Sequence, residues 1–262
     1  MSEDLQLIRE AALAAGKVAR DLQGKGLKTN WKPGNSGPVT NGDLAVDALL
    51  KERLLGARPG YGWLSEETAD NPDRLSRQRL FIVDPIDGTF AYVKGKPWYT
   101  VCVAVIDGDR PTAAVVYAPE LDEMYEASAG GGARLNGEVI SPSRREQLEA
   151  SSMLGDKKMF ADPRWPIPWP EMNIGSRNSI AYRMCLVAAG KFDACLAPSR
   201  KHDWDVAAAD LICTEAGAVV TDHKGRIFRY NHPVPRQPAL VCAGPALHRL
   251  LIERVAHIQL PE

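Results

Sequence analysis

The 262-residue sequence lacks any run of 18 or more apolar residues, so it predicts neither a transmembrane helix nor a membrane partner. It also lacks an excess of charge: 32 Lys and Arg stand against 33 Asp and Glu, which gives a net charge of -1. This balance argues against a protein that holds a nucleic acid polymer by bulk charge, although a local basic patch would be compatible with it. With 45% hydrophobic and 25% charged residues, the composition is that of a soluble globular protein.

Cysteine is scarce, and no C-x-x-C pair occurs. An odd number of cysteines without metal-finger spacing indicates buried free thiols in a reducing compartment. The residues concerned are Cys102, Cys185, Cys195, Cys213 and Cys242. The first residues, Met1–Asp4, are acidic where a secretory signal would be basic. We therefore expect a cytoplasmic protein.

Apolar periodicity predicts helices first, then strands, and then strands that alternate with helices. Helices are expected over residues 5–22, 41–55, 180–189, 204–216 and 245–257. Strands are expected over residues 61–64, 80–83, 99–106, 112–117, 123–127, 192–196, 218–221, 227–230 and 239–242. The strands from 99 to 127 alternate in polarity and are joined by short turns, which is typical of an antiparallel meander. The whole order predicts a layered α/β protein with two sub-domains, 1–145 and 146–262, that share one interface.

Loops and helix ends are marked by glycine, proline and capping residues. Thr40 or Asn41 would cap the helix over residues 41–55. Asp203 would cap the helix over residues 204–216. Residues 27–38 form a polar, glycine-rich loop, and residues 160–170 form a proline- and tryptophan-rich loop that we expect to pack onto the body. Gly130–Gly132 lacks the Gly-Lys-Ser/Thr ending of a phosphate-binding loop, so it indicates a hairpin.

Acidic residues stand repeatedly where an apolar element begins or ends. The apolar run Phe81–Val83 leads directly into Asp84-Pro85-Ile86-Asp87, for which a turn with Asx-type hydrogen bonds and a metal site are equally good interpretations. The other acidic residues in such places are Asp43, Glu66, Glu67 and Asp205. Each also has a structural interpretation. Glu66 and Glu67 could be ordinary surface acids, Asp205 could complement a helix dipole, and Asp43 could do the same or help to cap its helix.

Taken together, these carboxylates favour a metal site. If the strands 61–64 and 80–83 are neighbours, Glu66, Asp84 and Asp87 meet in the crevice beyond the strand ends. Clustered carboxylates repel one another unless a cation lies between them. No histidine or cysteine stands at ligand spacing, so the oxygen donors select a hard cation, Mg²⁺ before Ca²⁺ or Mn²⁺, and argue against zinc.

Several segments then carry a family resemblance. Trp63–Thr68, Val83–Thr89 and Trp204–Ala208 resemble, in this order, the signatures of the inositol monophosphatase family, and Val39–Asp43 and Thr214–Gly217 extend the match. The family comprises Mg²⁺-dependent, lithium-sensitive phosphatases, including the 3'(2'),5'-bisphosphate nucleotidases and relatives of fructose-1,6-bisphosphatase. The resemblance implies an α/β (α+β) fold of the layered αβαβα sandwich type.

The same resemblance implies a ligand set for two or three Mg²⁺ ions. Glu66, Asp84 and the carbonyl of Ile86 would hold one ion, and Asp84, Asp87 and Asp205 would hold a second, with Asp84 bridging. A third, weaker ion would bind near Glu66. Mn²⁺ would be a substitute for Mg²⁺, whereas Ca²⁺ and Li⁺ would inhibit.

Catalytic roles follow from the resemblance in the same way. Thr89, oriented by Asp43, would position and activate the attacking water, and Glu67 would support the site from behind the metal ligands. Gly88 and Thr89 could grip phosphate through their backbone N–H groups if a helix begins there. These residue types suit hydrolysis of phosphate monoesters, because paired metal ions can clamp the attacking and leaving oxygens without a covalent nucleophile.

In the family that the sequence resembles, substrate contacts come largely from the second half of the chain. Inositol monophosphatases usually carry a glutamate in the loop before Trp204, and residues 196–203 contain none, which counts against inositol phosphate. A group of basic and hydroxyl-bearing residues would suit a second phosphate, as on 3'-phosphoadenosine 5'-phosphate. Its members are Ser176, Arg183, Arg200, Lys201 and His202. The segments that hold these residues resemble those of the bacterial bisphosphate nucleotidase branch. Alternatively, Arg183 and Lys201 are solvated or paired with Asp203.

Other functions stay open at this point. The substrate could instead be inositol 1-phosphate, histidinol phosphate, fructose 1,6-bisphosphate or another sugar or alcohol phosphate. A non-enzyme alternative is a silent regulatory module that binds metal and phosphate, but the carboxylates and Thr89 are all present, so we expect activity. The expected partner is a small phosphorylated substrate, and the family resemblance also allows a homodimer.

Overall fold

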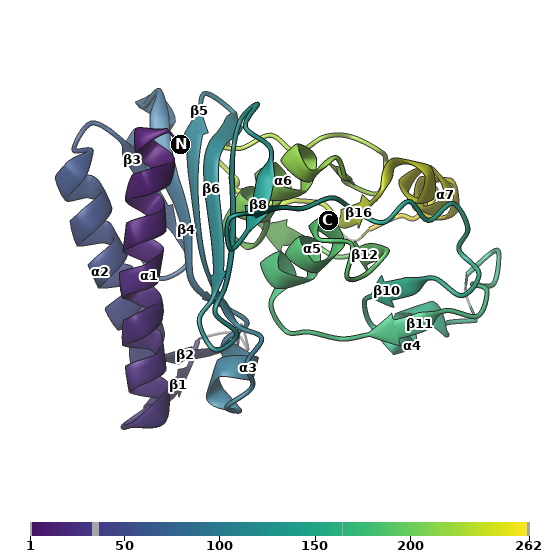
Figure 1. Cartoon of the computed structure of the whole chain (residues 1–262), viewed down its shortest axis with the longest axis horizontal. Coiled ribbons are helices and arrows are strands. Elements are labelled where there is room, and N and C mark those ends of the chain that lie inside the picture. The colour runs from purple at the N-terminus through teal and green to yellow at the C-terminus, as the bar shows by residue number, and fades with distance from the viewer. Residues whose placement is uncertain (1, 33–36, 164, 261–262) are drawn as a thin grey trace.

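The computed structural model describes residues 2–32, 37–163 and 165–260. Helices and sheets alternate in layers in the order α, β, α, β, α across the molecule (Figure 1). The first layer holds α1 (Glu3–Gly24) and α2 (Asn41–Ala57), and α2 is capped by the side chain of Thr40 as predicted. The predicted αβαβα sandwich is therefore confirmed.

The second layer is a sheet in the order β3-β4-β5-β6-β7-β8-β9. β3 and β4 are parallel and the remaining neighbours are antiparallel, so the predicted meander is confirmed. Its bounds are β3 (Gly62–Ser65), β4 (Arg79–Asp87), β5 (Thr100–Asp107), β6 (Arg110–Ala118), β7 (Glu123–Ser128), β8 (Ala133–Leu135) and β9 (Glu138–Val139). Helices cover both faces of this sheet, which explains why its central strands are mostly apolar and buried (Figure 1).

The end of β4 differs from the prediction. The strand was expected to stop at Val83, but it continues to Asp87 and pairs Asp84 with Cys102 and Asp87 with Thr100. The register shifts between these two pairs, so Pro85 and Ile86 lie in a bulge, where a residue without an N–H group is tolerated. The acidic stretch is therefore a bulged strand, and its interpretation as a turn is wrong.

The third layer holds α5 (Ile180–Ala188) and α6 (Asp203–Ala216), and the last layer holds α7 (Pro245–Val255). Between them lies a sheet in the order β11-β10-β12-β16-β14. Its bounds are β10 (Ser152–Leu154), β11 (Asn173–Gly175), β12 (Ala194–Ala197), β14 (Val219–Thr221) and β16 (Leu240–Ala243).

Two predictions in this half are wrong. The N-cap of α6 is His202 rather than Asp203, which lies inside the first turn. Residues 227–230 form no strand, although Phe228 and Tyr230 are buried. Their apolar alternation reflects burial against the core without strand pairing.

Short elements complete the chain. They are β1 (Thr29–Trp31), β2 (Pro38–Thr40), the 3-10 helix η2 (Pro72–Ser76), α3 (Thr89–Val93), α4 (Lys157–Phe160), β13 (Lys201–His202) and β15 (Arg236–Gln237). The predicted loop 27–38 thus contains β1 and the first residue of its partner strand β2, while its residues 33–36 lie outside the described residues. In the predicted loop 160–170, Trp169 packs against Phe160 and Trp165 at ring-centroid distances of 5.0 and 5.2 Å, so packing onto the body is confirmed for the described part.

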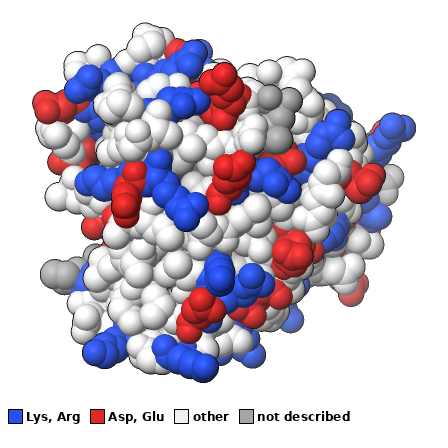
Figure 2. All heavy atoms as spheres, turned by 60° about the vertical axis from the view of Figure 1, so that its left-hand side comes forward, with Lys and Arg blue, Asp and Glu red and all other residues white. Residues whose placement is uncertain are grey.

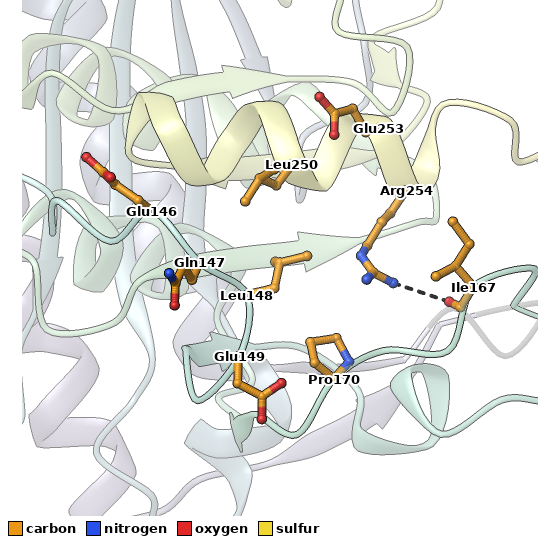
Figure 3. A pocket seen from close by; sticks show the side chains of 9 residues that line it. All are labelled: Glu146, Gln147, Leu148, Glu149, Ile167, Pro170, Leu250, Glu253 and Arg254. Atoms are coloured by element: carbon orange, nitrogen blue, oxygen red, sulfur yellow. Dashed lines mark hydrogen bonds between the residues drawn. The ribbon is translucent and has the colours of Figure 1, made fainter.

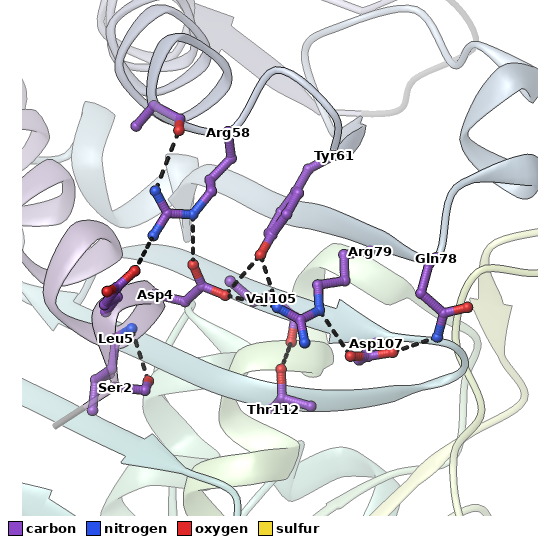
Figure 4. A network of polar contacts seen from close by, with 12 residues as sticks. Ser2, Asp4, Leu5, Arg58, Tyr61, Gln78, Arg79, Val105, Asp107 and Thr112 are labelled. Carbon is purple, nitrogen blue, oxygen red and sulfur yellow. Dashed lines mark hydrogen bonds and ion pairs between the residues drawn. The ribbon is translucent and has the colours of Figure 1, made fainter.

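Three apolar clusters hold the layers together, and one of them extends from the first sheet through α5 and α6 to the second sheet. One side of the first sheet packs on α1 and α2, the other side packs on α5 and α6, and the second sheet packs on α7. All five cysteines are buried free thiols, as predicted. At the edge of the first layer, Asp4 accepts hydrogen bonds from Arg58 and Tyr61, which ties α1 to the end of α2 (Figure 4).

The strands of the first sheet all lie within residues 62–139 and those of the second within 152–243. The division into 1–145 and 146–262 falls between these ranges and stays a prediction. No described helix is both long enough and apolar enough to cross a membrane. On the face in Figure 2, basic and acidic side chains are interspersed among uncharged surface, in keeping with the balanced composition.

Candidate active site

The pairing of β3 with β4 brings the first carboxylates together. Ser65 pairs with Val83, and the backbone N–H of Glu66 donates to the Val83 carbonyl at 3.4 Å, so Glu66 lies beside Asp84. The neighbouring strands that the sequence interpretation required are thus present. Asp84 is 1% exposed and Asp87 is 6% exposed, whereas Glu66 is half-buried.

Asp84 is the least compensated of these carboxylates. Its Oδ1 is buried and has no hydrogen-bond partner among the described residues. Burial raises its pKa well above the ordinary value, and the nearby carboxylates of Glu66, Asp87 and Asp205 raise it further. A buried carboxylate oxygen without a donor is unusual in a folded protein, and a bound cation would compensate it.

Asp87 joins the two halves of the chain. Its Oδ2 accepts hydrogen bonds from the Ser179 hydroxyl at 2.6 Å and from the Ala181 N–H at 2.7 Å, both at the start of α5. Burial raises its pKa to about 6, although these hydrogen bonds act in the opposite direction. The carboxylate is therefore fixed in orientation by the helix that packs on its sheet.

Asp205 belongs to the same cluster although it lies far along the sequence. Burial raises its pKa to about 8, and the next contributions come from Asp87 and Glu66. Its Oδ2 also accepts a hydrogen bond from the His202 N–H at 2.8 Å, as the acidic member of a capping box. Asp205 thus takes part in a helix end and also lies near the other carboxylates, and its role as a metal ligand stays a prediction.

Lys32 is a site residue that the sequence interpretation missed. Its Nζ lies 2.8 Å from the Oε1 atoms of both Glu66 and Glu67. Burial acts to lower the pKa of Lys32, but both carboxylates outweigh it and raise that pKa. Burial raises the pKa of Glu67 to about 7 even though Lys32 opposes the shift. A single lysine in a polar loop carries no sequence signal for such a contact.

Thr89 and Asp43 lie together as expected. The Thr89 hydroxyl is 3.2 Å from Asp43 Oδ1 and 3.2 Å from the carbonyl of Ile86. The other oxygen of Asp43 accepts hydrogen bonds from the hydroxyl and the N–H of Thr40 at 2.5 and 2.8 Å. Burial raises the pKa of Asp43 despite these donors. Their catalytic roles stay predictions, but the orientation is present.

Gly88 is required by the backbone. Its φ of 94° is left-handed, and a Cβ at this position would lie 2.9 Å from the backbone nitrogen of Ser179. α3 begins at Thr89, directly after it, so the condition set for phosphate binding by these N–H groups is met, and that binding stays a prediction. The close approach to Ser179 places this turn against the start of α5.

The residues predicted to contact substrate are only partly gathered. Burial lowers the pKa of Lys201, Asp205 raises it and Arg183 lowers it, so both a metal-ligand candidate and a second cation act on this lysine. Lys201 Nζ donates to Ser199 Oγ at 2.7 Å, and Arg183 Nε donates to the Arg177 carbonyl at 2.6 Å.

The predicted alternative partner of these cations is engaged elsewhere. Asp203 accepts a hydrogen bond from Gln237 at 2.8 Å, and within the described part of the chain it forms no ion pair with Arg183 or Lys201. Ser176 is exposed, and its carbonyl accepts a hydrogen bond from Arg177. Its contact with substrate stays a prediction.

The donor set fits a hard cation. The candidate ligands offer oxygen atoms only, and the unpartnered Asp84 oxygen lies among them. As the side chains stand, no group of His, Cys, Asp or Glu within residues 2–32, 37–163 and 165–260 is arranged to enclose a metal ion. Glu66 accepts a hydrogen bond from Lys32, Asp87 accepts one from Ser179, and Asp205 accepts one from the His202 N–H.

Other features do not belong to this site. A hollow of about 490 Å³ lies between residues 146–149, Ile167, Pro170 and α7, and Arg254 donates to the Ile167 carbonyl at its rim (Figure 3). None of the predicted site residues lines it. Gly130–Gly132 connects β7 to β8, and the Glu215 carboxylate accepts from the N–H groups of Gly130 and Gly132 at 2.8 and 2.9 Å. The predicted hairpin is confirmed.

Comparison with known proteins agrees with this geometry. The sequence model of the inositol monophosphatase family matches residues 1–260. The chain is 30% identical to a histidinol-phosphatase of Chlorobaculum parvum, with 98% of each chain covered, and 31% identical to inositol monophosphatase 2 of Solanum lycopersicum, with 87% of this chain and 90% of the relative covered. The crystal structure of the extragenic suppressor protein suhB from Bartonella henselae superposes with a TM-score of 0.84 at 26% identity over 98% of this chain and 99% of that one. The chain therefore belongs to the inositol monophosphatase family of metal-dependent phosphomonoesterases.

Proposed function

We propose that the chain hydrolyses a small phosphate monoester with Mg²⁺ as its metal, and that its preferred substrate carries a second phosphate. The observation that carries the first part is the buried, unpartnered oxygen of Asp84 among carboxylates that raise its pKa. Asp84, Glu66, Asp87, Asp205 and the Ile86 carbonyl would hold the metal ions. When bound, these ions supply charge neutralisation at the phosphoryl oxygens and acidify a water molecule.

The residues around Thr89 suit proton transfer from the attacking water. Its hydroxyl lies 3.2 Å from Asp43 Oδ1, so the hydroxyl proton can point to Asp43 while the Thr89 oxygen accepts a water proton. Thr40 occupies the other oxygen of Asp43, which leaves Oδ1 for this role. Burial raises the pKa of Asp43, and a more basic carboxylate is a better proton acceptor. Glu67, with a pKa of about 7, adds a second acid–base group beside the site.

The second phosphate is supported by Arg183 and Lys201. These cations lie near each other and beside Asp205, and neither forms an ion pair within the described residues. A phosphate group would supply the missing counter-charge and accept charge-assisted hydrogen bonds. A 3'-phosphoadenosine 5'-phosphate-like nucleotide is therefore our first substrate. The histidinol-phosphatase relative, matched over 98% of both chains, makes histidinol phosphate the second candidate.

A kinetic panel tests both parts of this proposal. The substrates are 3'-phosphoadenosine 5'-phosphate, inositol 1-phosphate, histidinol phosphate and fructose 1,6-bisphosphate, each with Mg²⁺ and with EDTA. We expect turnover only with Mg²⁺ and the highest kcat/KM for the bisphosphate nucleotide. No turnover of any substrate contradicts the hydrolase function, and a preference for histidinol phosphate replaces only the substrate.

Variants at the cations make the substrate test specific. Lys201→Met and Arg183→Gln should raise KM for the bisphosphate nucleotide by about tenfold and change KM for inositol 1-phosphate much less. Lys191→Met is a matched control, because Lys191 pairs with Glu123 on the surface at 2.7 Å. Equal effects on both substrates mean that these residues do not bind the second phosphate.

We further propose a cytoplasmic location, which the buried free thiols support. Li⁺ and Ca²⁺ are proposed inhibitors and Mn²⁺ a substitute, in keeping with the oxygen donor set. The homodimer stays a prediction. Activity measured with each ion tests the proposed ion effects. The mass of the protein in solution tests the homodimer.

A further inference from the structure

A second charged hollow lies in the C-terminal half, outside the carboxylate cluster. It has a volume of about 450 Å³, within the range of small-molecule sites. Its walls come from the loop before β13, the turn after β14, the residues around β15 and the segment 258–260. We call it the basic hollow, and it is lined by Arg200, His223, Lys224, Val234, Arg236, Gln237, Pro238, Ile258, Gln259 and Leu260.

Among the described residues, the cations that line the basic hollow form no ion pair, although Asp222 lies next to His223 and Lys224 in the chain. No Asp or Glu is among its described lining residues. Arg200 and Arg236 are exposed, and neither forms an ion pair with any described residue. The ammonium group of Lys224 is held at the rim by the carbonyl oxygens of Ala256 and Ile258. Like charges in one concave surface create a positive potential that favours an anionic ligand.

A buried histidine supplies a second, independent indication of a ligand. His223 is only 5% exposed, and its Nδ1 has no hydrogen-bond partner within the described residues. The ring has a backbone hydrogen bond with Ile258, so only one nitrogen is without a partner. Buried polar atoms are normally satisfied, and this one belongs to a residue that lines the hollow. Because the other ring nitrogen donates to the Ile258 backbone, Nδ1 of the neutral ring is an acceptor, and a hydroxyl group of a ligand can donate to it.

The basic hollow is distinct from the candidate active site but connected to it by backbone. None of Glu66, Asp84, Asp87 and Asp205 lines the hollow. Arg236 pairs with His202 in the β13–β15 ladder, and the N–H of His202 donates to Asp205. A molecule in the hollow would therefore lie one strand away from a metal-ligand candidate.

We propose that the basic hollow binds a small phosphorylated molecule that also carries a hydroxyl group. The phosphoryl oxygens accept hydrogen bonds from Arg200 and Arg236, and the hydroxyl group donates one to Nδ1 of His223. Guanidinium groups suit this task because they present paired donors in the geometry of a phosphate. Binding needs no metal and no turnover, so the site goes beyond the proposed hydrolysis.

The test is calorimetric titration of the full chain with glycerol 1-phosphate at low ionic strength in EDTA, where metal-dependent turnover is absent. The double variant Arg200→Gln/Arg236→Gln removes both guanidinium groups. The control Arg53→Gln/Arg249→Gln removes the same charge from exposed positions outside the hollow. The variant Asp84→Asn shows whether glycerol 1-phosphate binds at the carboxylate cluster. A titration with glycerol alone shows whether binding requires the phosphate group.

We expect saturable binding of glycerol 1-phosphate that weakens by at least about tenfold in the Arg200/Arg236 variant. The control pair and Asp84→Asn should bind as the unchanged chain does. His223→Phe should weaken binding as well, because the new side chain offers no polar atom. The proposal is overturned if the unchanged chain does not bind, if glycerol binds equally, if both double variants lose affinity equally, or if only Asp84→Asn loses it.

Discussion

The hydroxyl of Ser179 donates a 2.6 Å hydrogen bond to Asp87 Oδ2 and thereby connects the start of α5 to the bulged end of β4. The same hydroxyl accepts a hydrogen bond from the Tyr182 N–H at 2.9 Å, and it is 3.0 Å from that of Thr100. Ser179 is fully buried. One side chain thus caps a helix and orients a carboxylate that comes from the other half of the chain.

We predict that Ser179→Ala weakens Mg²⁺ binding through Asp87. The half-saturating Mg²⁺ concentration should rise by about tenfold, because the carboxylate loses a charge-assisted hydrogen bond that fixes its orientation. Ser2→Ala is the matched control, since Ser2 caps α1 in the same way and lies outside the site. Both variants should lose about 1 kcal/mol of stability. A Mg²⁺ dependence that is the same in both variants contradicts the positioning role.

We predict that Asp84→Asn abolishes Mg²⁺-dependent turnover and leaves the fold intact. The asparagine has the same shape but no charge, so kcat should fall by at least about 10³-fold. In EDTA the variant should melt no lower than the unchanged chain, because a buried carboxyl with a raised pKa has been replaced by a neutral group. Asp21→Asn, on the exposed side of α1, is the control for an ordinary carboxylate. Turnover that survives in Asp84→Asn argues against the bridging role.

We predict that Asp205 makes the metal-free chain less stable as the pH rises. Its folded pKa of about 8 lies above the ordinary value of 3.8, so the folded state binds the proton more tightly than the unfolded state does. The free energy of unfolding therefore falls between pH 4 and pH 8, and the loss is complete above about 8. The difference between the unchanged chain and Asp205→Asn isolates this group from the titrating histidines.

In EDTA, the free energy of unfolding of Asp205→Asn should rise relative to that of the unchanged chain as the pH increases from 4 to 8. The relative gain should reach up to about a few kcal/mol. Denaturant titrations at a series of pH values measure the gain. The asparagine can still accept from the His202 N–H, so the cap on α6 is kept. A difference that does not change with pH means that Asp205 titrates near its ordinary value in the folded chain.

The layered fold could be predicted from the sequence because local sequence patterns indicate the helices and strands of each layer. The helical period from residue 5 and the cap at Thr40 predicted the helices of the first layer. The alternation from Thr100 to Ala118 predicted the meander. The bulge at Pro85 was missed, since a proline and two aspartates after an apolar run look the same in a turn. Residues 227–230 were misassigned because burial produces apolar alternation without strand pairing.

The positions of the site carboxylates and the contact of Asp43 with Thr89 could be predicted, but the contacts with Lys32 and Ser179 could not. Asp84 and Asp87 follow a visible apolar run, and the parallel pairing of β3 with β4 brings Glu66 beside them. The contacts of Lys32 and Ser179 depend on segments that meet only in the folded chain. They span 34 positions from Lys32 to Glu66 and 92 positions from Asp87 to Ser179. Sequence periodicity carries no information about such distances.

We predict that Lys32→Met tightens metal binding. Lys32 Nζ lies 2.8 Å from both Glu66 and Glu67, so a metal ion that binds Glu66 has to displace this ammonium group. Without it, the Mg²⁺ affinity measured by calorimetry in the absence of substrate should rise several-fold, because both carboxylates lose their counter-ion. Lys28→Met is the matched control, since Lys28 is exposed and its side chain contacts neither glutamate among the described residues. An equal or lower affinity in Lys32→Met means that Lys32 supports the metal ligands and does not compete for them.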